Sequence, residues 1–133
     1  MKELIKIFFD GGVKGDEIAG AYVAKSSVDD KILFSNVKKM IGSTNNQAEY
    51  GALILAIEDC IHRGISNVII YGDSQLVVCQ ISGKYKVRNC RLRFLHQKAM
   101  GLLKQFNQWT INWVCREENQ EADALINKLF NRK

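Results

Sequence analysis

The 133-residue sequence lacks several features that define whole classes of protein. No apolar run approaches the roughly 20 residues that a membrane-spanning helix requires. The four cysteines are scattered and include no C-x-x-C pair. A secretory signal is also not expected, because Phe8 and Phe9 run straight into Asp10. These absences favour a cytoplasmic protein that has no membrane segment and whose thiols are reduced and mostly buried.

No linker, internal repeat or low-complexity segment divides the chain. Its length is typical of one domain and sufficient for a sizeable core, so we expect residues 1–133 to form a single domain. The formal net charge is +5 and the isoelectric point is near 9.1. This mild basicity suits an anionic partner, but it is too common to identify one. Nothing in the sequence suggests an obligate protein partner, so we expect a monomer.

Hydrophobic periodicity predicts five strands and four helices. The expected strands span 4–9, 18–24, 32–40, 67–71 and 110–116, the first and fourth being buried on both faces. The expected helices run from Thr44 to about His62 or Arg63, over 74–81, over 92–106, and onward from a cap at Asn119. In order these elements are β-β-β-α-β-α-α-β-α, which predicts an α/β fold with a five-stranded mixed sheet and helices on both faces.

A polar run at 43–49 opens the longest apolar segment. Thr44 is a good N-cap, and Gln47 three residues later completes a capping box. At 100° per residue, Glu49 shares the apolar stripe that contains Leu53. A carboxylate on the buried side of a helix is costly unless a positive group meets it, so Glu49 calls for a cation.

Three other carboxylates stand at the ends of predicted elements. Asp10 ends the first strand, Asp73 ends the fourth, and Asp123 lies in the first turn of the last helix. The first and fourth strands are the most apolar, so we expect them to be neighbours whose terminal aspartates point into one crevice. Four converging carboxylates would repel one another unless cations bound, and oxygen ligands suit Mg²⁺ or Mn²⁺. Two such ions favour in-line attack on a phosphodiester.

Each aspartate also has an ordinary structural explanation. Asp10 before two glycines could form an Asx turn, and Asp73 could be an N-cap. Asp123 could be a first-turn acid that the helix dipole stabilises. Taken alone, the N-cap and dipole explanations are the better ones. Glu49 is the hardest to explain in this way. If the carboxylates form no common site, an ordinary structural explanation must hold at all four positions at once.

Four motifs cover essentially the whole chain: F-x-D-G-G, S-T-N-N-Q-A-E-Y, Y-G-D-S-Q and W-V-x-R-E-x-N-x-E-A-D. Together they resemble type 1 ribonuclease H. The second and third motifs at this spacing are specific for the family, whereas D-G-G alone would be weak evidence for it. The resemblance implies a ribonuclease H fold and metal-dependent endonucleolytic hydrolysis of the RNA strand of RNA/DNA hybrids, leaving 5′-phosphate and 3′-hydroxyl ends. It also implies that Asp10, Glu49, Asp73 and Asp123 bind the metal ions.

The same resemblance implies contacts with the hybrid. Asn45, Asn46 and Gln47 correspond to residues that read the minor groove, where RNA exposes its 2′-hydroxyls. The backbone amides of Gly11 and Gly12 are expected to approach the RNA strand closely.

Thr44 and Asn119 resemble a pocket that grips a phosphate of the DNA strand. Helix capping is the alternative role for Thr44, Gln47 and Asn119, and both roles are compatible.

Three departures from the family pattern bear on function. The loop at 13–17 is short and partly acidic, which puts nucleic-acid contacts there in doubt. Arg116 stands nearest the place of a loop histidine, and an arginine cannot shuttle protons near neutral pH. It could instead steady a phosphate or the departing product. The basic protrusion of some members is missing, and cations of the connector at 82–93 are expected to serve instead, among them Lys84, Lys86 and Arg88.

An enzyme is the main interpretation, and two alternatives belong to other classes. A binding module would keep the fold and cleave poorly, but it would have no use for four converging acids. A resolvase or transposase with this fold would usually be longer and would lack the Thr-Asn-Asn-Gln block.

Overall fold

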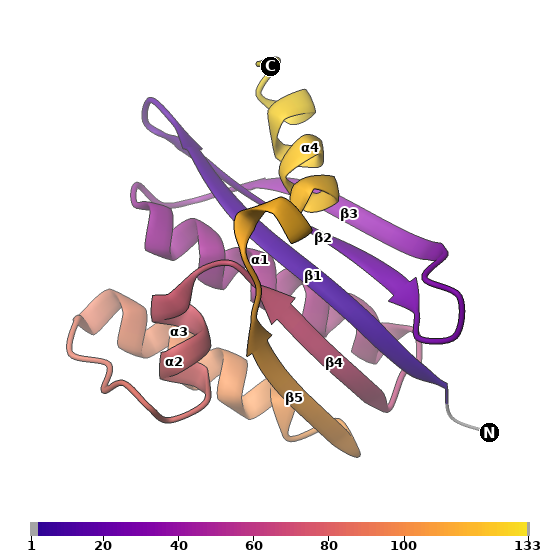
Figure 1. Cartoon of the computed structure of the whole chain (residues 1–133). Coiled ribbons are helices and arrows are strands. Elements are labelled where there is room, and N and C mark those ends of the chain that lie inside the picture. Colours follow the sequence, from indigo (N-terminus) through magenta and orange to yellow (C-terminus); the bar gives the residue numbers. More distant parts are fainter. Residues whose placement is uncertain (1–2, 133) are drawn as a thin grey trace.

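The computed structural model describes residues 3–132 and contains one five-stranded mixed sheet with the strand order β3-β2-β1-β4-β5 (Figure 1). The strands are β1 (Leu4–Lys14), β2 (Glu17–Ser26), β3 (Ile32–Met40), β4 (Asn67–Gly72) and β5 (Gln108–Trp113). The helices are α1 (Asn45–His62), α2 (Gln75–Ile81), α3 (Cys90–Leu103) and α4 (Gln120–Leu129), with a 3₁₀ turn, η1 (Arg116–Glu118), before α4. The predicted order of elements is confirmed. None of the helices within residues 3–132 is long and apolar enough to cross a membrane.

β1 lies at the centre of the sheet, antiparallel to β2 and parallel to β4. The predicted adjacency of the first and fourth strands is therefore confirmed. Their pairing ends with Phe9 opposite Gly72. An aspartate follows each of these two residues, so Asp10 and Asp73 lie side by side where the pairing of β1 with β4 ends.

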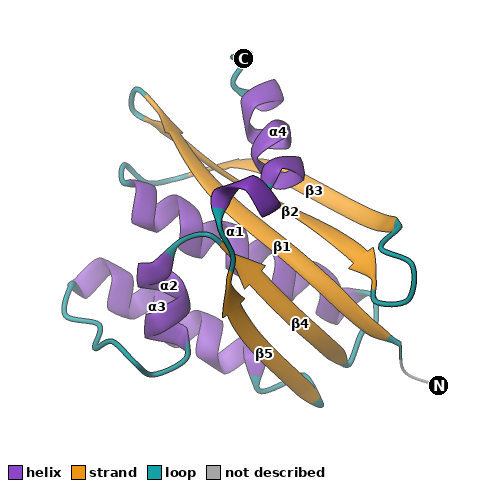
Figure 2. Ribbon diagram, viewed as in Figure 1, coloured by secondary structure: helices purple, strands orange, loops and turns teal. Residues whose placement is uncertain are grey.

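Helices cover both faces of the sheet, as expected. Figures 1 and 2 show α1, α2 and α3 behind the sheet and α4 in front of it. The main core lies between the sheet and the rear helices, whereas a small second core joins α4 to β2 through Ala19, Ala21, Ile126 and Phe130.

The expectation that β1 and β4 are buried on both faces is wrong. In both strands buried residues alternate with half-buried ones over most of the length, and it is β2 that is buried nearly throughout. The reason is that α4 is short and packs against β1, β2 and β3, so it leaves much of the front face over β4 uncovered.

The capping box at the start of α1 is present as predicted. The Thr44 hydroxyl accepts a hydrogen bond from the Gln47 backbone N–H (3.1 Å), and Gln47 Oε1 accepts one from the Thr44 N–H (3.0 Å). Because the cap fixes where the helix begins, it also fixes which residues face the sheet. Glu49 is one of these, together with Leu53 and Ala56, all of them buried.

Several element boundaries differ from the expected ones, and three of the differences have a clear cause. β1 continues past Asp10 to Lys14, because residues 11–14 still pair with β2. α3 begins at Cys90 rather than near 92, since the side chain of Asn89 caps it. β5 ends at Trp113 where its pairing with β4 ends, and the chain then turns through η1.

The expected state of the cysteines is only partly correct. All four thiols are free, but Cys60 alone is buried, whereas Cys90 is exposed. Cys79 and Cys115 lie between these extremes.

Candidate active site

Three carboxylates meet at the edge of the sheet where β1 and β4 separate. Asp10, Glu49 and Asp73 each offer an oxygen, and the three oxygens lie within 4.8 Å of one another. Asp10 and Glu49 are almost fully buried, and Glu49 Oε1 is a buried oxygen without a hydrogen-bond partner. Buried anionic oxygens at this spacing require protons or a cation between them, and the donor set is the one that Mg²⁺ and Mn²⁺ prefer.

Asp123 approaches the same cluster from the other face of the sheet. It lies in the first turn of α4, and its Oδ2 accepts a hydrogen bond from Asn127 Nδ2 (3.2 Å). Its charge acts on Asp10, but it is not one of the three residues whose oxygens share the 4.8 Å cluster. The four carboxylates singled out in the sequence thus consist of a tight group of three and a fourth beside Asp10.

Burial and mutual repulsion keep protons on this cluster in the absence of cations. Burial, followed by the charges of Asp73 and Asp123, raises the pKa of Asp10 to about 7. Burial, followed by the charges of Asp10 and Asp73, also raises the pKa of Glu49. A divalent cation between these groups would reverse both effects by favouring the ionised forms.

We expect the metal-free protein to lose stability as the pH rises. The pKa of Asp10 is higher in the folded chain than the 3.8 of an unperturbed carboxyl. The unfolded chain therefore releases this proton first, and the loss accumulates between about pH 4 and pH 7. Thermal unfolding in chelator should show a fall in the melting temperature on the order of 10 °C over this range.

The melting temperature of the Asp10→Asn variant should fall less over this pH range. Addition of Mg²⁺ or Mn²⁺ at pH 8 should restore the melting temperature in the wild type but not in this variant. Asp16→Asn, which alters an exposed turn residue, is the matched control and should behave as the wild type. If the melting temperatures of the wild type and Asp10→Asn fell equally with pH, this result would contradict repulsion within the carboxylate cluster.

Asp10, Glu49 and Asp123 line a hollow of about 370 Å³ that two arginines also border. Arg116, at the start of η1, is exposed and borders it. Arg132 borders it as well and is held in place, because its Nη1 donates to the Val13 carbonyl (2.9 Å) and its Nε to Asn127 Oδ1 (2.9 Å). The hollow therefore combines an anionic floor with a cationic rim, an arrangement that suits a phosphate group held against metal ions.

Gly11 and Gly12 line the same hollow from β1. The Gly11 N–H donates to Asp10 Oδ1 (3.0 Å), so this amide is already engaged with a carboxylate. A Cβ at Gly11 would lie 2.3 Å from the Ala48 carbonyl carbon, which shows that α1 crosses β1 in direct backbone contact. Glycine at position 11 is thus required for the packing of α1.

Asn119 has a different role from the two that the sequence suggested. It occupies the N-cap position of α4, but its side chain makes no capping hydrogen bond. It is buried, and its Nδ2 donates to the Phe9 carbonyl (2.8 Å) and to Asp73 Oδ2 (3.3 Å). Asn119 therefore ties Phe9, in the middle of β1, to Asp73, and it is too deep to grip a phosphate of the DNA strand.

Thr44 instead borders a second hollow, of about 310 Å³, with residues from the start of α3. Asn46 and Gln47 line it from α1, and Asn89 and Arg91 line it from α3. It presents hydroxyl, amide and guanidinium groups, which are the donors that bind a phosphate. Asn45 lies outside this hollow and borders the carboxylates.

The connector after α2 is exposed and basic, and a buried glutamine anchors it. Lys84, Lys86 and Arg88 are all exposed. Gln80 Oε1 accepts a hydrogen bond from the buried Tyr50 hydroxyl (2.6 Å), and its Nε2 donates to the Lys86 carbonyl (3.5 Å). The connector is therefore attached to the core at its middle.

Comparison with known proteins agrees with this geometry. Residues 8–129 match the family described as Reverse transcriptase-like. Ribonuclease HI of Halobacterium salinarum is 36% identical over 129 residues, which are 96% of this chain and 64% of that protein. The crystal structure of RNase H1 from the same archaeon has a TM-score of 0.91 at 35% identity and covers 96% of this chain and 98% of that one. The chain belongs to the type 1 ribonuclease H family.

Other members differ more in length. The bifunctional protein Rv2228c of Mycobacterium tuberculosis is 37% identical over 120 residues, which are 89% of this chain and 33% of that protein. The chain thus spans less than two thirds of the length of these curated relatives. The structure of LC11-RNase H1 in complex with RNA/DNA hybrid has a TM-score of 0.86 at 30% identity and covers 93% of this chain and 94% of that one.

The structure adds three residues to the candidate site that the sequence did not single out for these places. Asn89 and Arg91 join Thr44 in the second hollow, and Arg132 joins the carboxylates. Asn89 gave a usable signal, since it is a good N-cap three residues before Leu92, the first position of the apolar stripe of α3. Arg132 gave none, because only the fold brings the C-terminal residues to β1.

Proposed function

We propose that this chain hydrolyses the RNA strand of RNA/DNA hybrids with Mg²⁺ or Mn²⁺ as its cofactor. The observation that carries the proposal is the group of three carboxylates, two of them buried and Asp73 partly buried, whose oxygens lie within 4.8 Å of one another beside Asp123. Family membership supports it, as does the similarity to an RNase H1 solved with an RNA/DNA hybrid.

Asp10, Glu49, Asp73 and Asp123 would hold two metal ions. When bound, such ions activate a water molecule and stabilise the leaving 3′ oxygen, so the products would carry 5′-phosphate and 3′-hydroxyl ends. Asn119 keeps the Asp73 carboxylate oriented toward the cluster through its hydrogen bond to Oδ2. Arg116 would steady a phosphate at the rim of the hollow, since a guanidinium remains charged and donates in pairs to phosphate oxygens.

The start of α1 lies between the two hollows and would recognise the hybrid there. Asn45 borders the carboxylates, and Asn46 and Gln47 border the second hollow. Gln47 Oε1 is already occupied by the backbone N–H groups of residues 43 and 44, which leaves its Nε2 for a ribose hydroxyl. Gly11 and Gly12 would lie against the RNA strand, because they line the hollow that contains the carboxylates.

The second hollow would hold a phosphate of the DNA strand. Thr44 remains part of this proposal, and Asn89 and Arg91 take the place that the sequence assigned to Asn119. Lys84, Lys86 and Arg88 would add phosphate contacts from the connector, so affinity for the hybrid should fall as the salt concentration rises.

Cleavage of an end-labelled hybrid tests the proposal directly. With Mg²⁺ or Mn²⁺, we expect cuts in the RNA strand alone, and the downstream fragments should accept ligation without prior phosphorylation. Chelator should stop the reaction, and the same sequence as duplex DNA should remain intact. Binding of the hybrid without any cleavage in either metal would contradict the enzyme and favour a binding module.

A further inference from the structure

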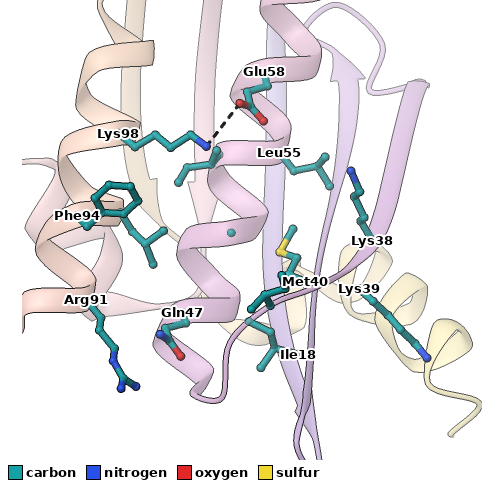
Figure 3. A pocket seen from close by; sticks show the side chains of 14 residues that line it. Ile18, Lys38, Lys39, Met40, Gln47, Leu55, Glu58, Arg91, Phe94 and Lys98 are labelled. Carbon is teal, nitrogen blue, oxygen red and sulfur yellow. Dashed lines mark ion pairs between the residues drawn. The ribbon is translucent and has the colours of Figure 1, made fainter.

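A third hollow is larger than both the carboxylate site and the Thr44 hollow. It is a groove of about 580 Å³ that crosses α1 between β3 and α3. Figure 3 shows Lys38 of β3 and Arg91, Phe94 and Lys98 of α3 around the groove, whereas the Lys39 side chain extends from β3 away from α1. No residue that lines this groove also lines the carboxylate hollow.

The charges along the groove are predominantly positive. Four cations and one carboxylate, Glu58, border it. Two of the cations have acidic neighbours, since Lys39 lies 3.3 Å from Glu17 and Lys98 lies 4.0 Å from Glu58, and both pairs are exposed. Lys38 and Arg91 take part in none of the ion pairs among residues 3–132. The groove therefore attracts an anion along its length.

Between the cations the groove is apolar. Met40 packs across α1 at Gly51, where a Cβ would lie 2.3 Å from the methionine sulfur, and Leu55 forms the floor beside it. The Phe94 ring is 68% exposed on the α3 side. Cationic rims over an apolar floor with an exposed aromatic ring are typical of surfaces that bind single-stranded nucleic acid. The stacked bases of a duplex could not reach such a floor.

The groove continues from the Thr44 hollow. Gln47 and Arg91 line both, so a strand whose phosphate occupied that hollow would enter the groove next. Since the hollow is proposed to hold the DNA strand, we infer that the groove binds an unpaired extension of the DNA strand of the hybrid. This inference rests on the proposed function and adds a substrate preference to it: hybrids that end in single-stranded DNA.

Fluorescence anisotropy tests this inference without any need for cleavage. Asp10→Asn protein would be titrated into a blunt hybrid, or into one whose DNA strand carries an unpaired thymidine extension of about eight nucleotides at its 5′ or its 3′ end. We expect the extension at one of the two ends to tighten binding about tenfold. Lys38→Glu and Phe94→Ala, each added to Asp10→Asn, should remove this gain and leave affinity for the blunt hybrid nearly unchanged.

Lys31→Glu is the control, because it makes the same charge change at an exposed lysine outside the groove and should keep the gain. No gain from either extension, or a gain that survives both groove variants, would overturn the inference. The proposed function would then stand, provided that the blunt hybrid is still bound and is cut by the wild type. Failure to bind the blunt hybrid would instead count against the proposed function itself.

Discussion

Asp73→Asn should abolish cleavage of the hybrid and leave the fold intact. An amide in place of this carboxylate removes the negative charge from one of the three groups whose oxygens lie within 4.8 Å of one another, and with it an anionic ligand for a divalent cation. Loss of several kcal/mol of transition-state stabilisation corresponds to a fall in rate of at least about 10³-fold. Asp73 is only partly buried, so the neutral amide should not destabilise the chain, and relief of repulsion should raise the metal-free melting temperature.

The measurement is single-turnover cleavage with Mg²⁺, alongside thermal unfolding in chelator. Asp16→Asn makes the same change of net charge in the exposed turn between β1 and β2 and should cleave at the wild-type rate. Cleavage by Asp73→Asn within a few-fold of wild type would refute the metal assignment. Loss of cleavage with a lowered melting temperature would indicate damage to the fold instead.

Local patterns predicted most of the framework. The capping box located the start of α1, and hydrophobic periodicity then placed Glu49 on the buried side. The two apolar runs that end at Asp10 and Asp73 predicted adjacent strands, and β1 and β4 are indeed paired. The helix prediction succeeded because it depends on residues within one or two turns. The strand pairing was predicted correctly although the burial expected on both faces is found in β2 instead.

Roles that depend on distant partners could not be predicted in this way. Asn119 has the sequence context of an N-cap, but its amide bonds the Phe9 carbonyl 110 residues away. Arg132 reaches Val13 across 119 residues. Arg91 falls within the connector expected at 82–93, whereas the early start of α3 places it beside Thr44. In each case the local pattern fits an ordinary role, and only the tertiary fold shows which groups meet.

Gly11→Ala should damage both stability and activity, through packing rather than chemistry. The added Cβ would lie 2.3 Å from the Ala48 carbonyl carbon and 2.4 Å from the Glu49 nitrogen. Both are backbone atoms of α1, so no side chain can move aside, and the helix must shift away from β1. Overpacking of this kind costs about 1–3 kcal/mol, and more where the backbone is the obstacle. Because the shifted segment carries Glu49, hybrid cleavage should fall as well.

The matched control is Gly101→Ala in α3, where a Cβ would meet nothing within 4 Å. Alanine is favoured over glycine inside a helix by about 1 kcal/mol, so this variant should melt at a higher temperature than the wild type and cleave normally. Opposite shifts from the same chemical change would show that the requirement at position 11 is contact with α1 and not backbone flexibility. A Gly11→Ala protein with wild-type stability and activity would show that α1 can recede from β1 without displacing Glu49, and that the carboxylate cluster tolerates more movement than its close packing indicates.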